Sequence, residues 1–136
     1  LSLPRIYHAS IEVDFHHLDA EHLPFEDASF DTVVSTMTLC SIPDAPHALA
    51  EIRRVLRPGG KFVFMEHGLA PEPRVARLQR RLEPYWKPMA GGCHLARPIR
   101  QLVEQSGLAI TEVQSNYLRK TPRFVGYLTE GLAERV

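Results

Sequence analysis

The chain has 136 residues, with sixteen basic and sixteen acidic side chains that leave no formal net charge. This length allows at most one domain, and the balanced charge argues against a nucleic-acid-binding surface. No apolar run approaches the roughly 20 residues that cross a bilayer. Two cysteines and no recognisable signal peptide predict a reduced, cytoplasmic protein without a membrane span.

The first clear pattern is at Ile11–His17, where apolar and polar residues alternate. Alternation of this kind is typical of a half-buried strand. Residues 22–29 contain Pro24, Glu26 and Asp27 and are expected to form a loop.

A second strand is predicted where Thr32, Val33 and Val34 form a β-branched run, a composition typical of strands buried on both faces. A helix is predicted after Asp44, because an aspartate side chain can cap the first turn. The apolar residues of this helix recur at three- and four-residue spacing and form one stripe: Leu49, Ile52, Val55 and Leu56.

The helix is expected to end at Pro58-Gly59-Gly60, because proline cannot continue it and glycine tolerates a left-handed exit. One of the two glycines should therefore have a positive φ. Lys61–Met65 is then predicted to form the next apolar strand. A strand, a crossover helix and another strand form a right-handed parallel unit, in which the helix covers the sheet.

The C-terminal half predicts two more helices, Val75–Leu82 and Arg97–Ser106, and two more strands, Ala109–Tyr117 and Phe124–Thr129. Pro84 and Pro88 are expected to interrupt the chain between the helices. The two strands are expected to pair as antiparallel neighbours.

Three blocks of the sequence resemble the second half of a class I S-adenosylmethionine-dependent methyltransferase, in content and in spacing: Asp19–Phe25, Ser29–Asp31 and Glu51–Gly60. The resemblance runs from about Asp14 to the C-terminus. Two further segments, Leu39-Cys40-Ser41 and Gly91–Leu95, resemble the branch of small-molecule enzymes that includes thiol methyltransferases and is similar to the ubiquinone-pathway enzymes.

This resemblance implies an α/β fold, a partial Rossmann-like methyltransferase sheet that is mostly parallel with an antiparallel C-terminal strand pair. The glycine-rich turn that the family places after its first strand has no counterpart in these 136 residues. We therefore expect a single truncated domain, residues 1–136, in which the family's first two strands are absent. Those strands lie between the family's third and fourth, so the strand at Asp31–Ser35 should have an open apolar edge.

Two arrangements would remove this open edge. Ile11–His17 could pair directly with Asp31–Ser35, or the edge could pair with a second copy of the chain. We favour the second arrangement, a homodimer, because the missing strands also leave apolar surface uncovered.

The resemblance also implies S-adenosylmethionine as the cofactor and a small molecule as the methyl acceptor. Asp19, Ala20 and Glu21 would meet the adenine, with the Asp19 carboxylate accepting from its exocyclic amine. A loop aspartate that caps a turn is the alternative role. Ser35, Thr36 and Met37 follow the end of a strand, where ligands bind in open α/β sheets, and would face the cofactor's sulfonium side. A simple strand exit built from small residues is equally compatible with these three.

His67 ends the next strand and is the candidate catalytic base toward an acceptor thiol, since imidazole exchanges protons near neutral pH. A structural hydrogen bond is the competing role. Cys93 and His94 would line the acceptor pocket, unless Cys93 is only a small buried residue at a turn. No metal is expected, because the seven histidines show no recognised zinc spacing and methyl transfer from a sulfonium does not require one.

Two functions are compatible with these observations. The first is an enzyme that transfers a methyl group from S-adenosylmethionine to a small acceptor. The second is a non-catalytic module of methyltransferase fold that acts through dimerisation or a protein partner. The missing glycine turn favours the module and predicts weak cofactor binding or none, whereas the later motifs favour the enzyme.

Overall fold

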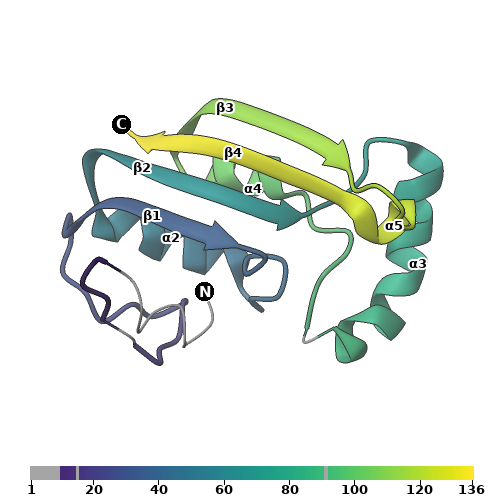
Figure 1. Ribbon diagram of the computed structural model, residues 1–136, viewed down its shortest axis with the longest axis horizontal. Helices are drawn as coiled ribbons and strands as arrows, with labels where there is room; N and C mark the ends of the chain where they lie inside the picture. Colours follow the sequence, from purple (N-terminus) through teal and green to yellow (C-terminus); the bar gives the residue numbers. More distant parts are fainter. Residues whose placement is uncertain (1–9, 15, 91) are drawn as a thin grey trace.

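The computed structural model describes residues 10–14, 16–90 and 92–136. In this part of the chain, four strands form one open sheet in the order β1-β2-β4-β3 (Figure 1). The strands are β1 (Phe30–Thr36), β2 (Leu56–His67), β3 (Leu108–Tyr117) and β4 (Tyr127–Arg135). The helices are α2 (Ala45–Val55), α3 (Pro73–Met89), α4 (Ile99–Gln105) and α5 (Arg123–Gly126).

The predicted strand–helix–strand unit is confirmed, because β1 and β2 pair in parallel and α2 connects them. The Asp44 carboxylate caps α2 by accepting from the backbone N–H of His47 at 3.0 Å. Gly59 has the predicted positive φ, +81°, but it lies within β2, because α2 ends at Val55 rather than at Pro58. A Cβ on Gly60 would lie 2.7 Å from the carbonyl oxygen of Arg57, so both glycines fit their positions for steric reasons.

The C-terminal strands pair antiparallel as predicted, with β4 inserted between β2 and β3. The expectation of a mostly parallel sheet is wrong, since one pair of strands is parallel and two are antiparallel. The strand predicted at Ile11–His17 does not form part of the described sheet. Its described residues, 11–14 and 16–17, form no strand and do not pair with β1, and Ile11 is 72% exposed. Alternation alone could not hold this segment in a sheet, because a strand needs a neighbour to satisfy its backbone.

Other boundaries also differ from the prediction. Strand β2 begins at Leu56 rather than at Lys61. Helix α3 runs through Pro84 and Pro88, although proline removes a helical hydrogen bond. Both prolines are exposed, so water can reach the carbonyl groups that lose their partners. The last strand begins at Tyr127 rather than Phe124, because Pro122 accepts backbone hydrogen bonds from Val125 and Gly126 and starts the short helix α5.

Helices α2 and α4 lie against one face of the sheet, and the core is formed between them (Figure 1). Phe62, Phe64 and Leu49 are completely or almost completely buried there. The opposite face carries exposed apolar residues, including Val34, and an open cavity of about 570 Å³ bordered by β2, β3 and β4. Strand β1 forms the edge of the sheet, as predicted.

Within the described ranges, no helix is both long enough and apolar enough to cross a membrane.

Candidate functional site

A buried carboxylate organises the C-terminal ends of β1 and β2. Glu66 is fully buried, and its side chain accepts hydrogen bonds from the Ser35 hydroxyl at 2.8 Å and from three successive backbone N–H groups at 3.1–3.4 Å, those of Thr38, Leu39 and Cys40. These bonds fold the loop after β1 over the end of β2. The Ser35 hydroxyl, predicted to face the cofactor, is thus engaged inside the protein.

The connector between α3 and α4 is fastened to the same loop. The backbone N–H of His94 donates to the carbonyl oxygen of Cys40 at 2.6 Å, and a ring nitrogen of His94 lies 2.9 Å from that oxygen. The Arg97 guanidinium donates to the carbonyl oxygens of Leu39 and Ile42. Three chain segments far apart in sequence therefore meet at one place.

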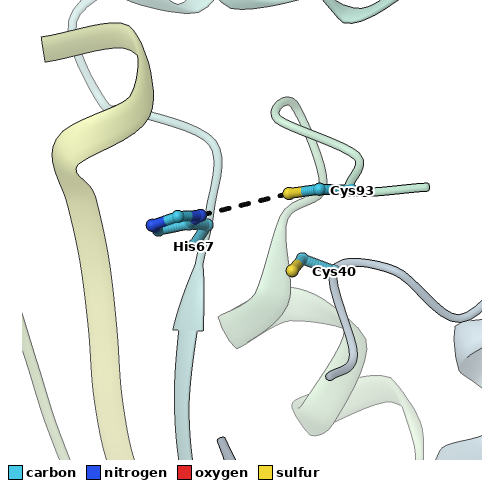
Figure 2. Close-up of side chains that lie close together, drawn as sticks. All are labelled: Cys40, His67 and Cys93. Atoms are coloured by element: carbon cyan, nitrogen blue, oxygen red, sulfur yellow. Dashed lines mark hydrogen bonds between the residues drawn. The ribbon is translucent and has the colours of Figure 1, made fainter. Parts of the chain in front are cut away.

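At this junction Cys40, His67 and Cys93 come together (Figure 2). One side-chain atom from each residue, a sulfur or a ring nitrogen, lies within 4.8 Å of those of the other two. The Cys93 Sγ is 4.0 Å from the His67 Nδ1. Both cysteines are buried and free of disulfides, and His67 is half-buried. The structure thus brings together the predicted residues His67 and Cys93, and adds Cys40.

The two thiols have opposite electrostatic environments. A hydrogen bond from the Cys40 thiol raises the pKa of Cys40 and lowers that of Cys93, and burial raises the pKa of Cys40 further. His67 and the indole N–H of Trp86 also lower the pKa of Cys93, against the effect of burial. The Trp86 N–H is buried and makes no hydrogen bond within the part of the chain that the structure describes. Cys93 is therefore the thiol whose thiolate form is favoured.

The predicted adenine-binding turn is formed by local hydrogen bonds. Asp19 accepts from the backbone N–H of Glu21 at 2.9 Å and contacts the His22 ring nitrogen at 3.2 Å. These two bonds lower the pKa of Asp19. The aspartate therefore caps a turn, and its exposed carboxylate still has acceptor capacity for a ligand. Ala20, beside it, packs on the edge of the core, and Glu21 is half-buried.

Helix α2 holds the chain that follows this turn. Arg54 donates to the carbonyl oxygens of Leu23 and Phe25 and pairs with Asp27 at 2.8 Å. Glu51 accepts from the backbone N–H of Leu23 at 2.9 Å, and its hydrogen bond with Arg54 lowers the pKa of Glu51 to about 2. The loop is therefore fixed by a helix rather than by a strand.

The other predicted cofactor residues, Thr36 and Met37, lie at the end of β1. Thr36 borders the cavity on the open face of the sheet, which residues 19–21 do not line. Met37 has a positive φ of 54°, and its backbone N–H donates to the carbonyl oxygen of Met65 at 2.8 Å. A non-glycine residue in this conformation is uncommon and marks a constrained strand exit.

Comparisons with known proteins agree with this architecture. Residues 4–64 match a family model described as a methyltransferase domain. A thiol S-methyltransferase from Rattus norvegicus is 44% identical over 89 residues, which cover 65% of this chain and 36% of the relative. A ubiquinone/menaquinone biosynthesis C-methyltransferase from Bartonella henselae is 39% identical over 66 residues, which cover 48% of this chain and 25% of the relative.

Solved structures show the same fold. A candidate methyltransferase from Bacillus halodurans matches with a TM-score of 0.74 at 17% identity, covering 90% of this chain and 78% of that chain. An S-adenosylmethionine-dependent methyltransferase from Methanosarcina mazei matches with a TM-score of 0.66 at 22% identity, covering 88% and 65%. Residues 4–64 therefore match a methyltransferase domain, and the chain has the fold of solved S-adenosylmethionine-dependent methyltransferases. It spans about a third of the length of the thiol S-methyltransferases that it matches.

The described residues fit one end of S-adenosylmethionine better than the other. At the adenine end, the exposed Asp19 carboxylate has free acceptor capacity beside the short Ala20 side chain. At the methionine end, none of the described helices begins with a glycine turn, since their N-caps are Asp44, Glu72, Pro98 and Pro122. Asp19 and Ala20, at the adenine end, are therefore the described residues that would hold the cofactor.

Proposed function

We propose that this protein transfers a methyl group from S-adenosylmethionine to a small-molecule thiol at the C-terminal ends of β1 and β2. The observation that carries the proposal is the 4.0 Å approach of the His67 Nδ1 to the Cys93 Sγ beside the two strand ends. A histidine at this place can handle the proton of an acceptor thiol. The thiol S-methyltransferase relative supports this class of acceptor.

S-adenosylmethionine supplies, when bound, a methyl group already activated on a sulfonium. Asp19 and Ala20 orient the adenine, and the turn that carries them is fixed to α2 through Arg54. His67 accepts the proton from the acceptor thiol, leaving a thiolate as the nucleophile. Cys93 and His94 line the acceptor side, where the burial of both cysteines excludes water.

The test is the transfer of a labelled methyl group from S-adenosylmethionine to dithiothreitol, measured against pH. His67→Gln should lower the rate by about 10²–10⁴-fold and should lose least at high pH, where the thiol ionises without help. His17→Gln changes an exposed histidine outside the site and should retain full activity. Equal rates and equal pH profiles for His67→Gln and the unchanged chain would refute the role of His67, and failure to methylate any thiol would refute the acceptor class.

The proposal includes a homodimer formed through the open edge of the sheet and a cytoplasmic location. The exposed apolar side chain of Val34 on the edge strand supports the dimer. The two free thiols at the site support a reducing compartment, because oxidation would join or block them.

A further inference from the structure

We propose that Cys40, His67 and Cys93 form a binding site for a soft divalent metal ion of the zinc class. Two thiolates and one imidazole are ligands that zinc prefers in proteins. The three residues come from the loop after β1, the end of β2 and the connector between α3 and α4, and Figure 2 shows them gathered around one point. Within residues 10–14, 16–90 and 92–136, this cluster is the one that brings three possible metal ligands of this kind together.

The distances between the ligand atoms are close to those that an ion requires. In a tetrahedral zinc site, with bonds of about 2.0–2.3 Å, neighbouring ligand atoms lie about 3.6 Å apart. The Cys93 Sγ and the His67 Nδ1 are 4.0 Å apart, and all separations in the cluster are within 4.8 Å. Shortening these separations by about 1 Å would bring all three atoms to bonding distance of one ion.

The backbone around the cluster is already held in place. Glu66 accepts from the backbone N–H of Cys40, and His94 donates its backbone N–H to the carbonyl oxygen of Cys40. Groups that orient the ligands in this way raise metal affinity, because fewer degrees of freedom are lost on binding. Arg97 is also near, but its guanidinium donates to backbone carbonyls of the loop and so does not occupy the cluster.

The charges of the proposed site would balance. Two thiolates neutralise a divalent cation, which removes the cost of burying either charge alone. The Trp86 N–H, buried and otherwise without a partner, can donate to the Cys93 sulfur whether or not an ion is bound. Three protein ligands leave one position of a tetrahedral ion open, as in catalytic rather than structural zinc sites.

Sequence spacing predicted no metal because motif rules look for ligands a few residues apart. Here 26 positions separate His67 from Cys93, and only the fold brings them together. If the open position takes an acceptor thiol, the ion would deprotonate it in place of His67. That extension rests on the proposed function, whereas metal binding itself does not.

The experiment uses the reduced 136-residue chain and zinc alone, with binding followed by calorimetry and by metal content after gel filtration. We expect one zinc per chain, and a loss of affinity exceeding about 10-fold in each of Cys40→Ser, His67→Gln and Cys93→Ser. The double variant His22→Gln/His47→Gln is the control, because these two exposed rings lie 5.1 Å apart and offer a competing surface site. It should bind zinc as the unchanged chain does.

Substitution with Co²⁺ keeps the test valid if a variant does not fold. The unchanged chain should show thiolate-to-cobalt charge-transfer absorption together with the visible bands of a tetrahedral ion, and addition of zinc should abolish both. The proposal is overturned if the reduced chain binds no zinc, if the cobalt spectrum lacks thiolate absorption, or if only the control variant loses binding. Because no S-adenosylmethionine is added, failure of the proposed methyl transfer would leave this result unchanged.

Discussion

The two faces of the sheet differ in how far the described residues cover them. On β2, Phe62 and Phe64 point toward α2 and α4 and are 0% and 1% exposed, whereas Val63, between them, is 38% exposed on the other face. On β1, Val33 packs on the core while its neighbour Val34 is 66% exposed. Neighbouring apolar residues of the same strand are therefore buried on one face and exposed on the other. The apolar pattern of a strand alone does not show which face of the sheet is covered.

The largest effect should come from a buried polar group on the covered side. Glu66→Ala removes the acceptor for four hydrogen bonds and leaves backbone N–H groups unpaired in the interior. We expect a loss of about 4 kcal/mol in the free energy of unfolding, or failure to fold. Glu130→Ala, an exposed glutamate of β4, is the matched control and should change it by less than about 0.5 kcal/mol. Chemical denaturation measures both, and similar losses would mean that the two faces do not differ as described.

Adjacent valines on β1 separate folding from assembly. Val33→Lys places a charge against the core and should destabilise the protein by on the order of 3 kcal/mol. Val34→Lys should leave the stability of the monomer almost unchanged, but should dissociate the proposed dimer, because it charges the open face at the edge strand.

Sedimentation of the two valine variants and the unchanged chain completes this test. A dimer that dissociates with Val34→Lys would place a second copy at the edge. If the chain without substitutions stays monomeric at high concentration, the dimer is ruled out.

Cofactor affinity tests the same difference at the strand ends. This sequence has no glycine-rich turn to bind the methionine end of S-adenosylmethionine. Each charged hydrogen bond that is missing there is worth roughly 1.5–3 kcal/mol. Titration calorimetry should therefore detect weak binding. A submicromolar dissociation constant for the monomer would contradict this, and it would show that the described residues suffice as a cofactor site.

The smallest effect should come from the start of β2, where Gly59 lies. Gly59→Val forces a β-branched residue to a φ of +81°, and should destabilise the protein by about 1 kcal/mol or more. Gly68→Ala is a suitable control, because a Cβ there would make only ordinary contacts of 3.5–3.6 Å. Thermal unfolding compares the two, and equal midpoints would count against backbone strain at this position.

Local signals account for the elements that the sequence predicted well. Asp44 caps α2, and Gly59 has the predicted positive φ near the start of β2, so the unit β1–α2–β2 could be recognised from residues a few positions apart. The strand expected at Ile11–His17 failed because alternation gives no information about a partner strand. Helix α3 was predicted to end at Leu82, before its two prolines, but it continues through both of them, because exposed prolines interrupt a helix less than buried ones would.

The candidate site was predictable only in part. The end of a predicted strand drew attention to His67, and the resemblance to the thiol methyltransferase branch drew attention to Cys93. The structure places the His67 Nδ1 and the Cys93 Sγ 4.0 Å apart. The organising role of Glu66 and the position of Cys40 left no local pattern, because the hydrogen bonds that define them span 26 or more residues. Such contacts become visible only when the ends of β1 and β2 are placed side by side.

The position of β4 has a consequence for the order in which the protein can fold. During synthesis β3 emerges before β4, yet in the described sheet its neighbour is β4, which lies between it and β2. The backbone of β3 therefore stays unpaired in this sheet until β4 has left the ribosome and can pair with both β2 and β3. Of the four described strands, β4 is synthesised last and completes the sheet. This is a non-local step of the kind that folds slowly and exposes a chain to aggregation or to chaperones.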